Sequence, residues 1–403
     1  MSHQKQIILL LSLTLVFGSV SLSAQNQEKE EQHLYQITEI TNVPHTAVNN
    51  QGSSGTCWCF AGIGLVEAEI LRLYDKSFNL SEMFTVRNAW TEKVNRYVRM
   101  HGYSPLSQGG EVCDVLYMID KYGMMPESDY TGMVIGEKRH AHNEMNDVIS
   151  AYANAVLKCG NGKLTPVWQD VLPGILDTYL GEVPESFTVD GKKYTAQSFA
   201  QAYPIHPENY IEIASFTHVA FDKPFIVEIP DNWTWTSAYN LPLDDLMASL
   251  DHALENGYTV GWAQDVSDKG FSRKEGVGIV PDDDIDKLKA EHPEKYAGMT
   301  DREIKDKLYA FEEVVAEKAI TPEEHQKAYD NWETTDAHSM LIVGIAKDQN
   351  GTKYYKVKNS WGTENMGYDG YWFCSESYVR LHTVFFTLHK EALPKGTAKR
   401  LGS

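Results

Sequence analysis

The feature that most constrains the fold is a change of hydrophobic period along the chain. After Trp58, apolar residues recur at spacings of three and four, at Ile63, Val66 and Ile70, which predicts a helix. Near the other end, HSMLIVGIAKD and KYYKVKNSWG flank an Asn-Gly pair at residues 350–351, and this pattern is typical of a β-hairpin. The sequence therefore predicts an α+β fold whose first part is helical and whose last part is rich in β-strands.

Other segments extend this division. Residues 25–45 are predicted to be an extended lead-in, and residues 81–101 and 111–123 to be helices, the second ending at Gly123. Residues 137–215 are predicted to be mostly helical, and residues 242–257 to be a helix followed by a strand at 258–265. Residues 282–331 are acidic and predicted to be helical, whereas 367–379 and 382–390 are expected to continue the sheet.

The first 24 residues have the layout of a secretory signal. A polar start with one lysine, MSHQKQ, precedes an apolar run of about 14 residues and then the small, polar SLSA. This run is shorter than the ~20 residues that a membrane-spanning helix needs, so an uncleaved membrane anchor is the less favoured alternative. We expect residues 1–24 to be a signal peptide and the protein to be exported, to the periplasm or outside the cell.

Charge and cysteine usage exclude several classes of function. The net charge of −20 disfavours non-specific binding to nucleic acid. The five cysteines include no CxxC pair, which argues against a structural zinc site or a disulfide oxidoreductase, and the acidic residues after position 281 lack an EF-hand pattern. No cofactor or metal is predicted. An odd number of cysteines in an exported chain indicates a free, reactive thiol.

The candidate for this thiol is Cys57, in NQGSSGTCWCFA at residues 50–61. It follows a loop of small residues at the predicted start of a helix, where the helix dipole lowers a thiol pKa. His338 could add a second positive charge, and Asn359 could hold the imidazole in one orientation. The backbone N–H of Cys57 and the side-chain amide of Gln51 are candidate donors to an oxyanion.

These residues carry a resemblance to a known family. QGSSGTCWCFA (residues 51–61), TDAHSMLIVGI (335–345) and KNSWG (358–362) are similar to the motifs of papain-like cysteine peptidases. Segments 108–130, 239–266 and 325–338 resemble the bleomycin hydrolase and aminopeptidase C family within that clan, whereas residues 137–222 could not be matched. The resemblance implies a papain-like fold, with a helical half that carries the cysteine and an antiparallel β half that carries the histidine and asparagine.

Carried over residue by residue, the resemblance implies a role for each motif position. Cys57 becomes the nucleophile, His338 the general base and acid, Asn359 the orienting residue and Gln51 the oxyanion donor. The implied substrate-binding residues are Gly109, Gly110, whose backbone pairs with the substrate, Ala337, and Trp361, which shields the bond between asparagine and histidine. Cys59 is then an ordinary helix residue, on nearly the opposite side of the helix and facing a core.

The spacing of the motifs predicts a large insertion. Compact papain-type enzymes place the histidine roughly 130–150 residues after the cysteine, whereas here the separation is 281 residues, 338 minus 57. The predicted domains are therefore residues 1–24 as signal peptide, 25–136 as the helical half, 137–224 as a mostly helical insertion, and 225–403 as the β-rich half with a C-terminal tail.

The resemblance implies an aminopeptidase that acts on peptide substrates and assembles as a homo-oligomer, since family members are hexameric. In that family the C-terminal carboxylate lies in the cleft and binds the free amine of the substrate. Here the end reads HKEALPKGTAKRLGS, is basic, and could not be aligned with the family tail. An endopeptidase on the same fold and an inactive peptide-binding protein therefore remain as alternatives.

Overall fold

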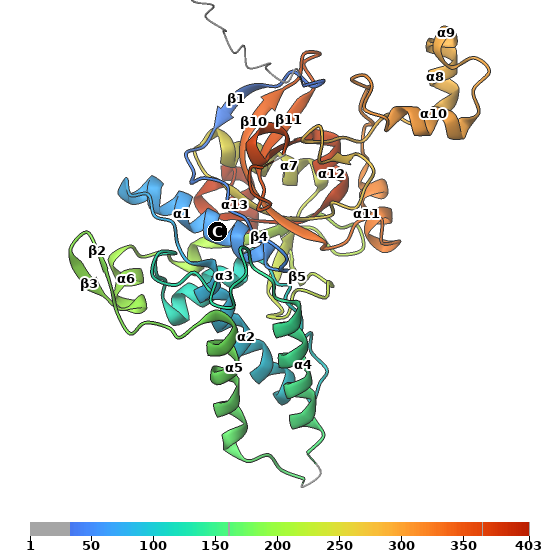
Figure 1. Ribbon diagram of the computed structural model, residues 1–403. Coiled ribbons are helices and arrows are strands. Elements are labelled where there is room, and N and C mark those ends of the chain that lie inside the picture. Colours follow the sequence, from blue (N-terminus) through green and yellow to red (C-terminus); the bar gives the residue numbers. More distant parts are fainter. Residues whose placement is uncertain (1–32, 160–161, 365, 403) are drawn as a thin grey trace, which may run out of the picture. The chain divides into compact units, whose positions relative to one another are not determined.

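A mostly antiparallel β-sheet forms the frame of the protein (Figure 1). The computed structural model describes residues 33–159, 162–364 and 366–402, so the predicted signal peptide lies outside the described residues. The strands run in the order β5 (Pro224–Ile226), β6 (Ser237–Asn240), β4 (Tyr210–Ala214), β13 (Thr383–His389), β7 (Val260–Gln264), β10 (His338–Lys347), β11 (Lys353–Lys358), β12 (Tyr371–Ser375), β9 (Val277–Gly278) and β8 (Phe271–Ser272). β1 (Thr38–Asn42) also pairs with β10, which therefore has three partner strands.

Helices from the first half of the chain form one body, which meets a face of this sheet through the first and third of them. They are α1 (Cys57–Tyr74), α2 (Glu82–Arg99), α3 (Val112–Tyr122), α4 (Asn143–Leu157) and α5 (Val171–Leu180), followed by the hairpin β2 (Phe187–Val189) and β3 (Lys192–Tyr194) and by α6 (Ala196–Ala202). Their apolar side chains form one continuous core, which also includes Leu341 and Val343 of β10. The helices predicted at 81–101 and 111–123 are confirmed as α2 and α3.

Helix α1 is the central helix of this half. Every residue from Trp58 to Ile70 is buried, as expected for a helix that is enclosed on all sides. Gly62 allows α3 to approach closely, because a Cβ atom at this position would lie 2.4 Å from Cγ2 of Val115. This close packing fixes the position of the helix start, where Cys57 lies.

A second core fills the other face of the sheet. It is formed by apolar residues of the strands together with α7 (Leu243–Glu255), α12 (Glu376–His382) and α13 (Lys395–Leu401). The helices α8 (Ile285–Glu291), α9 (Pro293–Tyr296) and α10 (Asp301–Leu308) form a projection with a small core of their own, and α11 (Pro322–Asp330) follows. The acidic segment 282–331 is therefore helical only in short pieces, and residues 309–321 contain no helix.

Two β-region predictions have different outcomes. β10 and β11 form the predicted antiparallel hairpin, with a five-residue loop at 348–352 in which Asp348 Oδ1 accepts from the N–H groups of Asn350 and Thr352, each at 2.9 Å. The expectation that residues 367–379 continue the sheet to their end is wrong. The strand β12 ends at Ser375, whose hydroxyl accepts from the N–H of Tyr378 and so caps the start of α12.

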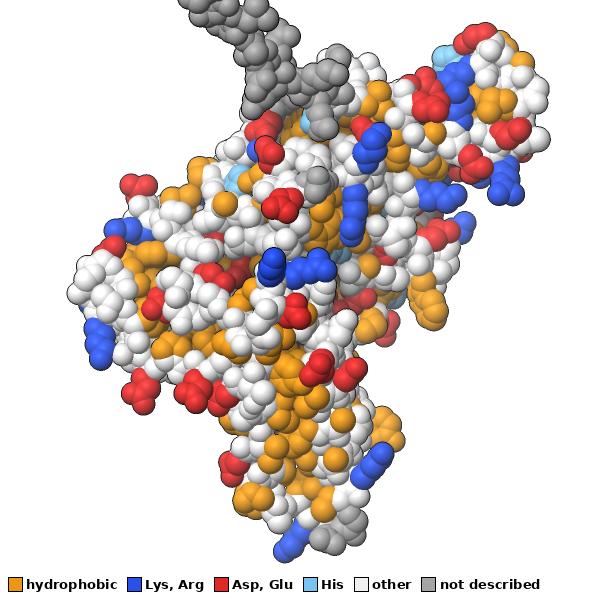
Figure 2. Space-filling model, viewed as in Figure 1, with side chains coloured by type: hydrophobic (Ala, Val, Ile, Leu, Met, Phe, Trp, Pro, Cys, Tyr) orange, Lys and Arg blue, Asp and Glu red, His pale blue; other side chains and the backbone are white. Residues whose placement is uncertain are grey.

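The predicted insertion, residues 137–224, contains α4, α5, the β2–β3 hairpin and α6. Near its end, β4 joins the main sheet beside β13. Figure 2 shows apolar side chains gathered over the α4 and α5 region, and the exposed ones there include Val148, Val167 and Val171. Among the described residues, none of the helices is both long and apolar enough to span a bilayer.

Candidate active site

Cys57 lies at the first residue of α1, where the loop 51–56 becomes helical. The carbonyl of Thr56 accepts from the N–H groups of Cys59 and Phe60, so the N–H groups of Cys57 and Trp58 precede the regular hydrogen-bond ladder. Cys57 is partly exposed, whereas Cys59 is fully buried with its Sγ 3.3 Å from the carbonyl oxygen of Glu82. The prediction that Cys59 faces the core is confirmed.

His338 is the first residue of β10, and Asn359 directly follows β11, the neighbouring strand. The imidazole Nε2 lies 2.8 Å from Oδ1 of Asn359, and the same oxygen accepts from the N–H of Ser360 at 2.7 Å. Because an amide oxygen can only accept, Nε2 carries a proton and Nδ1 is the basic nitrogen. The Trp361 ring covers the imidazole, with ring centroids 4.9 Å apart.

Cys57 and His338 come together although they are far apart in the sequence. The backbone N–H of Ser339, the residue after His338, forms a hydrogen bond with the Cys57 sulfur and lowers its pKa, as does the N–H of Trp58. Burial has the larger effect and raises the pKa of Cys57 to about 12. Burial likewise lowers the pKa of His338 to about 4. The backbone N–H donors therefore lower the thiol pKa as expected, and burial opposes them.

Gln51 connects the two halves of the site. Its backbone N–H donates to the carbonyl oxygen of Ser360 at 2.8 Å, and its Oε1 accepts from the Ser360 hydroxyl at 2.5 Å. Its Nε2 donates to the carbonyl oxygen of Ser54 at 2.7 Å. A side-chain amide has two N–H donors, so one remains for a ligand. The structure thus places Gln51 beside the segment that carries Asn359 and in the loop that leads to Cys57.

The loop 107–110 forms the other side of the site. Nε1 of Trp58 donates to the carbonyl oxygen of Gln108 at 3.0 Å, which ties this loop to the start of α1. The buried Lys93 donates to the carbonyl oxygens of Ser107, at 3.1 Å, and of Gly109. Gly110 is buried, and a Cβ atom here would lie 3.1 Å from the Trp58 ring. Both loop glycines therefore lie close to the thiol-bearing helix start, whereas Ala337 is exposed next to His338.

Sequence reasoning missed three charged residues around this site. Glu111 and Asp231 are close enough for their charges to raise the pKa of Cys57, and the guanidinium of Arg273 lies 4.1 Å from the centroid of the Trp361 ring. Glu111 directly follows the Gly-Gly pair, a position that could have drawn attention to it. Asp231 and Arg273 lie in loops that only the folded chain brings here.

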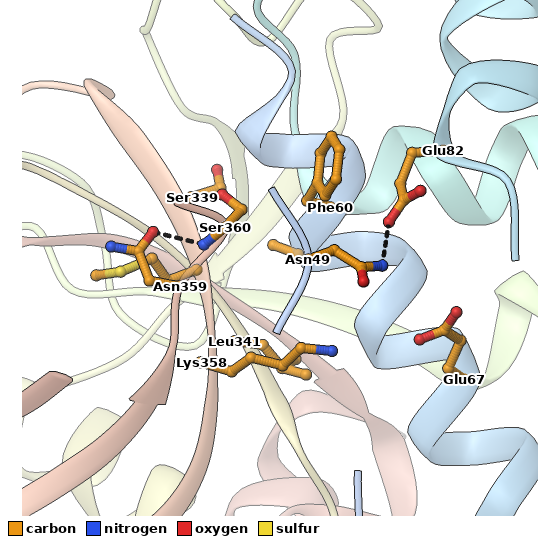
Figure 3. Close-up of a pocket in the computed structure, with 11 residues that line it drawn as sticks. Asn49, Phe60, Glu67, Glu82, Ser339, Leu341, Lys358, Asn359 and Ser360 are labelled. Carbon is orange, nitrogen blue, oxygen red and sulfur yellow. Dashed lines mark hydrogen bonds between the residues drawn. The ribbon is translucent and has the colours of Figure 1, made fainter. Parts of the chain in front are cut away.

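A small polar cavity lies between the two halves, next to Asn359 (Figure 3). Its volume of about 10 Å³ is near the minimum that holds one water molecule. Lys358 Nζ donates to the Thr46 hydroxyl at 2.9 Å, and this hydroxyl donates to the buried carboxylate of Glu67. In the same cavity burial raises the pKa of Glu82 to about 8. The Thr46 hydroxyl therefore connects Lys358 of β11 with Glu67 of α1.

The described end of the chain is anchored to α7 and to Asp222. Arg400 of α13 forms ion pairs with Asp222, at 3.2 Å, and with Asp245 of α7, at 2.5 Å. Leu401 is buried in the core that contains α7. The C-terminal helix therefore packs beside α7 as far as Gly402.

The five cysteines form no disulfide bonds. In the part of the chain that the structure describes, no group of three or more His, Cys, Asp or Glu side chains is arranged to hold a metal ion.

Residues 13–403 match the model of the peptidase C1-like family. The chain is 24% identical over 397 residues to aminopeptidase C of Lactobacillus delbrueckii subsp. lactis, which covers 88% of this chain and 81% of the relative. It is 23% identical over 391 residues to aminopeptidase C of Listeria monocytogenes, covering 86% and 81% of the two chains. The crystal structure of PepW from Lactobacillus rhamnosis superposes with a TM-score of 0.66 at 20% identity, covering 91% of this chain and 84% of that one.

Proposed function

The chain belongs to the peptidase C1-like family, and from this premise we propose that it is a cysteine aminopeptidase that removes residues from the free N-terminus of peptides. The papain-like α+β fold predicted from the sequence is confirmed by the likeness to PepW. Two curated relatives that span most of the chain are aminopeptidases, which supports the preference for N-terminal residues.

One observation carries the proposed chemistry. Asn359 accepts from Nε2 of His338 at 2.8 Å, which leaves Nδ1 as the nitrogen that can take a proton. The sulfur of Cys57 accepts a hydrogen bond from the backbone N–H of Ser339, the residue after His338. This arrangement of nucleophile, base and orienting residue is the one that activates a thiol for acyl transfer.

In the proposed reaction, the proton of the Cys57 thiol passes to Nδ1 of His338 and the sulfur attacks the carbonyl carbon of the first peptide bond. Because burial disfavours each separate charge, the thiolate and the imidazolium form together and stabilise one another. The oxyanion accepts hydrogen bonds from the Cys57 N–H and the free N–H of Gln51. Losing one such donor typically slows the reaction by ~10²–10³.

The tetrahedral intermediate then collapses as the C–N bond breaks. The imidazolium of His338 gives its proton to the leaving amine, and the acyl group stays on the sulfur of Cys57. In the second half, a water molecule gives a proton to His338 and attacks the thioester carbonyl. The C–S bond breaks, the free amino acid leaves, and the sulfur recovers its proton from the imidazolium.

The decisive experiment is digestion of one peptide with a free and with an acetylated N-terminus, followed by mass spectrometry. An aminopeptidase shortens the free peptide one residue at a time and leaves the acetylated peptide intact. Internal cleavage of both peptides supports the endopeptidase. Failure to cleave either peptide, together with a Cys57 thiol that does not react with an epoxide inhibitor, supports the binding protein.

We also propose that the protein is exported and that it assembles as a homo-oligomer. Export is supported by the polar, apolar and small-residue order of residues 1–24. Sequencing of the mature N-terminus tests it, and a start near Gln25 is expected. Oligomerisation is supported by the family resemblance, and light scattering of the purified protein measures its mass.

A further inference from the structure

A short loop connects the loop 107–110 with the residues that precede His338. This loop, residues 227–236, follows β5, and its Asp231 donates its backbone N–H to Oδ2 of Asp336 at 3.0 Å. The carboxylate of Asp231 accepts from the Ser107 hydroxyl at 3.4 Å. It also lies so close to Gly109 that a Cβ atom on this glycine would be 1.9 Å from Oδ2. Asp231 thus connects the loop 107–110 with the residues just before His338.

Asp231 lies against Gly109, in the loop that Trp58 ties to the start of α1 through the carbonyl oxygen of Gln108. Its charge raises the pKa of the Cys57 thiol, so the carboxylate lies within electrostatic reach of the nucleophile. Asp231 is partly exposed, as are its neighbours Asp336 and Gly109. A ligand that occupies the site can therefore reach this carboxylate, and peptide that extended further past it would meet the loop.

The surroundings of Asp231 are rich in carboxyl groups, and burial raises the pKa of Glu111 well above its usual range. Glu111, Asp114, Asp231 and Asp336 influence one another electrostatically and share this region with the ammonium of Lys93. That ammonium already donates to the carbonyl oxygens of Ser107 and Gly109. Burial and the charge of Asp336 raise the pKa of Asp231 to about 6.

Glu111 provides a separate indication that a donor is missing. Its side chain is only 2% exposed, yet its Oε2 has no hydrogen-bond partner in the structure. Glu111 directly follows Gly110 of the loop 107–110, so this unpartnered oxygen lies at the edge of the same site. A buried carboxylate oxygen without a partner is unusual and costly, and a positively charged donor would satisfy it.

We propose that Asp231 binds the N-terminal ammonium of the peptide substrate, with the neighbouring Asp336 adding to the negative potential. This inference rests on the proposed aminopeptidase function and names the group that sets its preference for a free amine. In aminopeptidase cleavage, this ammonium lies one residue before the scissile bond, next to the nucleophile. The bridge by the 227–236 loop would also exclude longer peptide on this side. The family resemblance implies the C-terminal carboxylate for this role, and the test below distinguishes the two groups.

The test compares Asp231→Asn with the wild type on two probes, leucyl-coumarin amide and its N-acetyl derivative. Asparagine keeps the size and the acceptor for Ser107 but loses the charge. We expect kcat/KM for the free amine to fall roughly 10- to 100-fold, the value of one charged hydrogen bond. We expect kcat/KM for the acetylated probe to stay equal or to rise, since the penalty of an unpaired carboxylate is removed.

The matched control is Asp177→Asn, which removes the same charge from α5, where it pairs with Arg87 at 2.6 Å. This variant should leave the ratio of kcat/KM for the free-amine probe to kcat/KM for the acetylated probe unchanged. A second variant deletes residues 402–403 and so moves the terminal carboxylate. If this deletion removes the free-amine preference and Asp231→Asn does not, the inference is overturned in favour of the chain end.

The two hypotheses fail in different ways. If the wild type cleaves both probes equally well, the aminopeptidase function itself is wrong. If the wild type prefers the free amine and folded Asp231→Asn keeps that preference, only the role of Asp231 is wrong. Unfolding temperatures of all variants show whether a loss of rate reflects a loss of structure, and Asp231→Glu, which retains the charge, should recover part of the preference.

Discussion

The replacement of Asn359 by alanine tests the core of the mechanism. In the structure, Asn359 Oδ1 accepts from Nε2 of His338 at 2.8 Å, and the imidazole is only 5% exposed. Removing the acceptor leaves a buried N–H without a partner. The cost of such a loss is ~1–3 kcal/mol, and it is greatest when the imidazole is charged, because the bond to Asn359 raises the pKa of His338.

The rate should therefore fall and not vanish. If the full cost appears in the transition state, in which His338 is an imidazolium, kcat falls roughly 5- to 150-fold. The pKa of His338, about 4 in the native protein, should fall further. Since activity is lost at low pH when the imidazole is protonated before the thiol reacts, the acid limb of kcat/KM should move to lower pH.

The assay is the pH profile of kcat/KM on a free-amine coumarin amide, measured for the wild type, Asn359→Ala and Asn359→Asp. Aspartate keeps an acceptor and adds a charge, so it should move the acid limb to higher pH. Asn256→Ala, at the exposed C-terminal end of α7, is the control and should match the wild type. A folded Asn359→Ala protein with the wild-type rate and pH profile would show that His338 is not oriented in this way.

Three further predictions concern the same region. Cys57→Ala should abolish hydrolysis without lowering the unfolding temperature, whereas the buried Cys59→Ala should lower stability and leave kcat largely intact; equal loss of rate in both would reverse the assignment. Gln51→Ala should lower kcat by ~10²–10³ with little change in KM, and a change in KM alone would contradict an oxyanion role. Glu82 has a folded pKa of about 8 and an ordinary unfolded one, so its stabilising contribution is present below pH 4.5 and declines as pH rises toward 8. Urea titrations should therefore show that the free energy of unfolding of Glu82→Gln, relative to that of the wild type, rises by about 1 kcal/mol per pH unit across this window. A difference that does not change with pH would refute the buried, protonated state of Glu82.

Much of the fold followed from local patterns in the sequence. The spacing of apolar residues predicted α1, and the alternation around Asn350 predicted the β10–β11 hairpin, because both depend on neighbours in the sequence. Residues 376–379 were misassigned to the strand because the short pattern of residues 371–379 is compatible with both a strand and a helix. The hydroxyl of Ser375 decides between them by capping α12.

Some residues of the candidate site could likewise be predicted from the sequence, and others could not. Cys57, His338 and Asn359 could be named from the sequence because each lies in a motif with a recognisable pattern. Asp231 could not, because its neighbours at Gly109 and Asp336 are distant in sequence and meet it only when the loop after β5 crosses between them. The opposing effect of burial on the pKa of Cys57 also depends on packing that the sequence does not reveal.

The close packing at Gly64 has a consequence for how the enzyme loses activity on heating. This residue of α1 faces β10 and β11 so closely that a Cβ atom would lie 3.3 Å from Cδ2 of Leu341 and 3.5 Å from Nζ of Lys358. The proposed nucleophile and base, Cys57 and His338, therefore lie on elements whose spacing is set by packing in the protein interior. On heating, catalytic activity should persist until the interior itself opens, so inactivation and loss of tertiary structure should occur at one temperature.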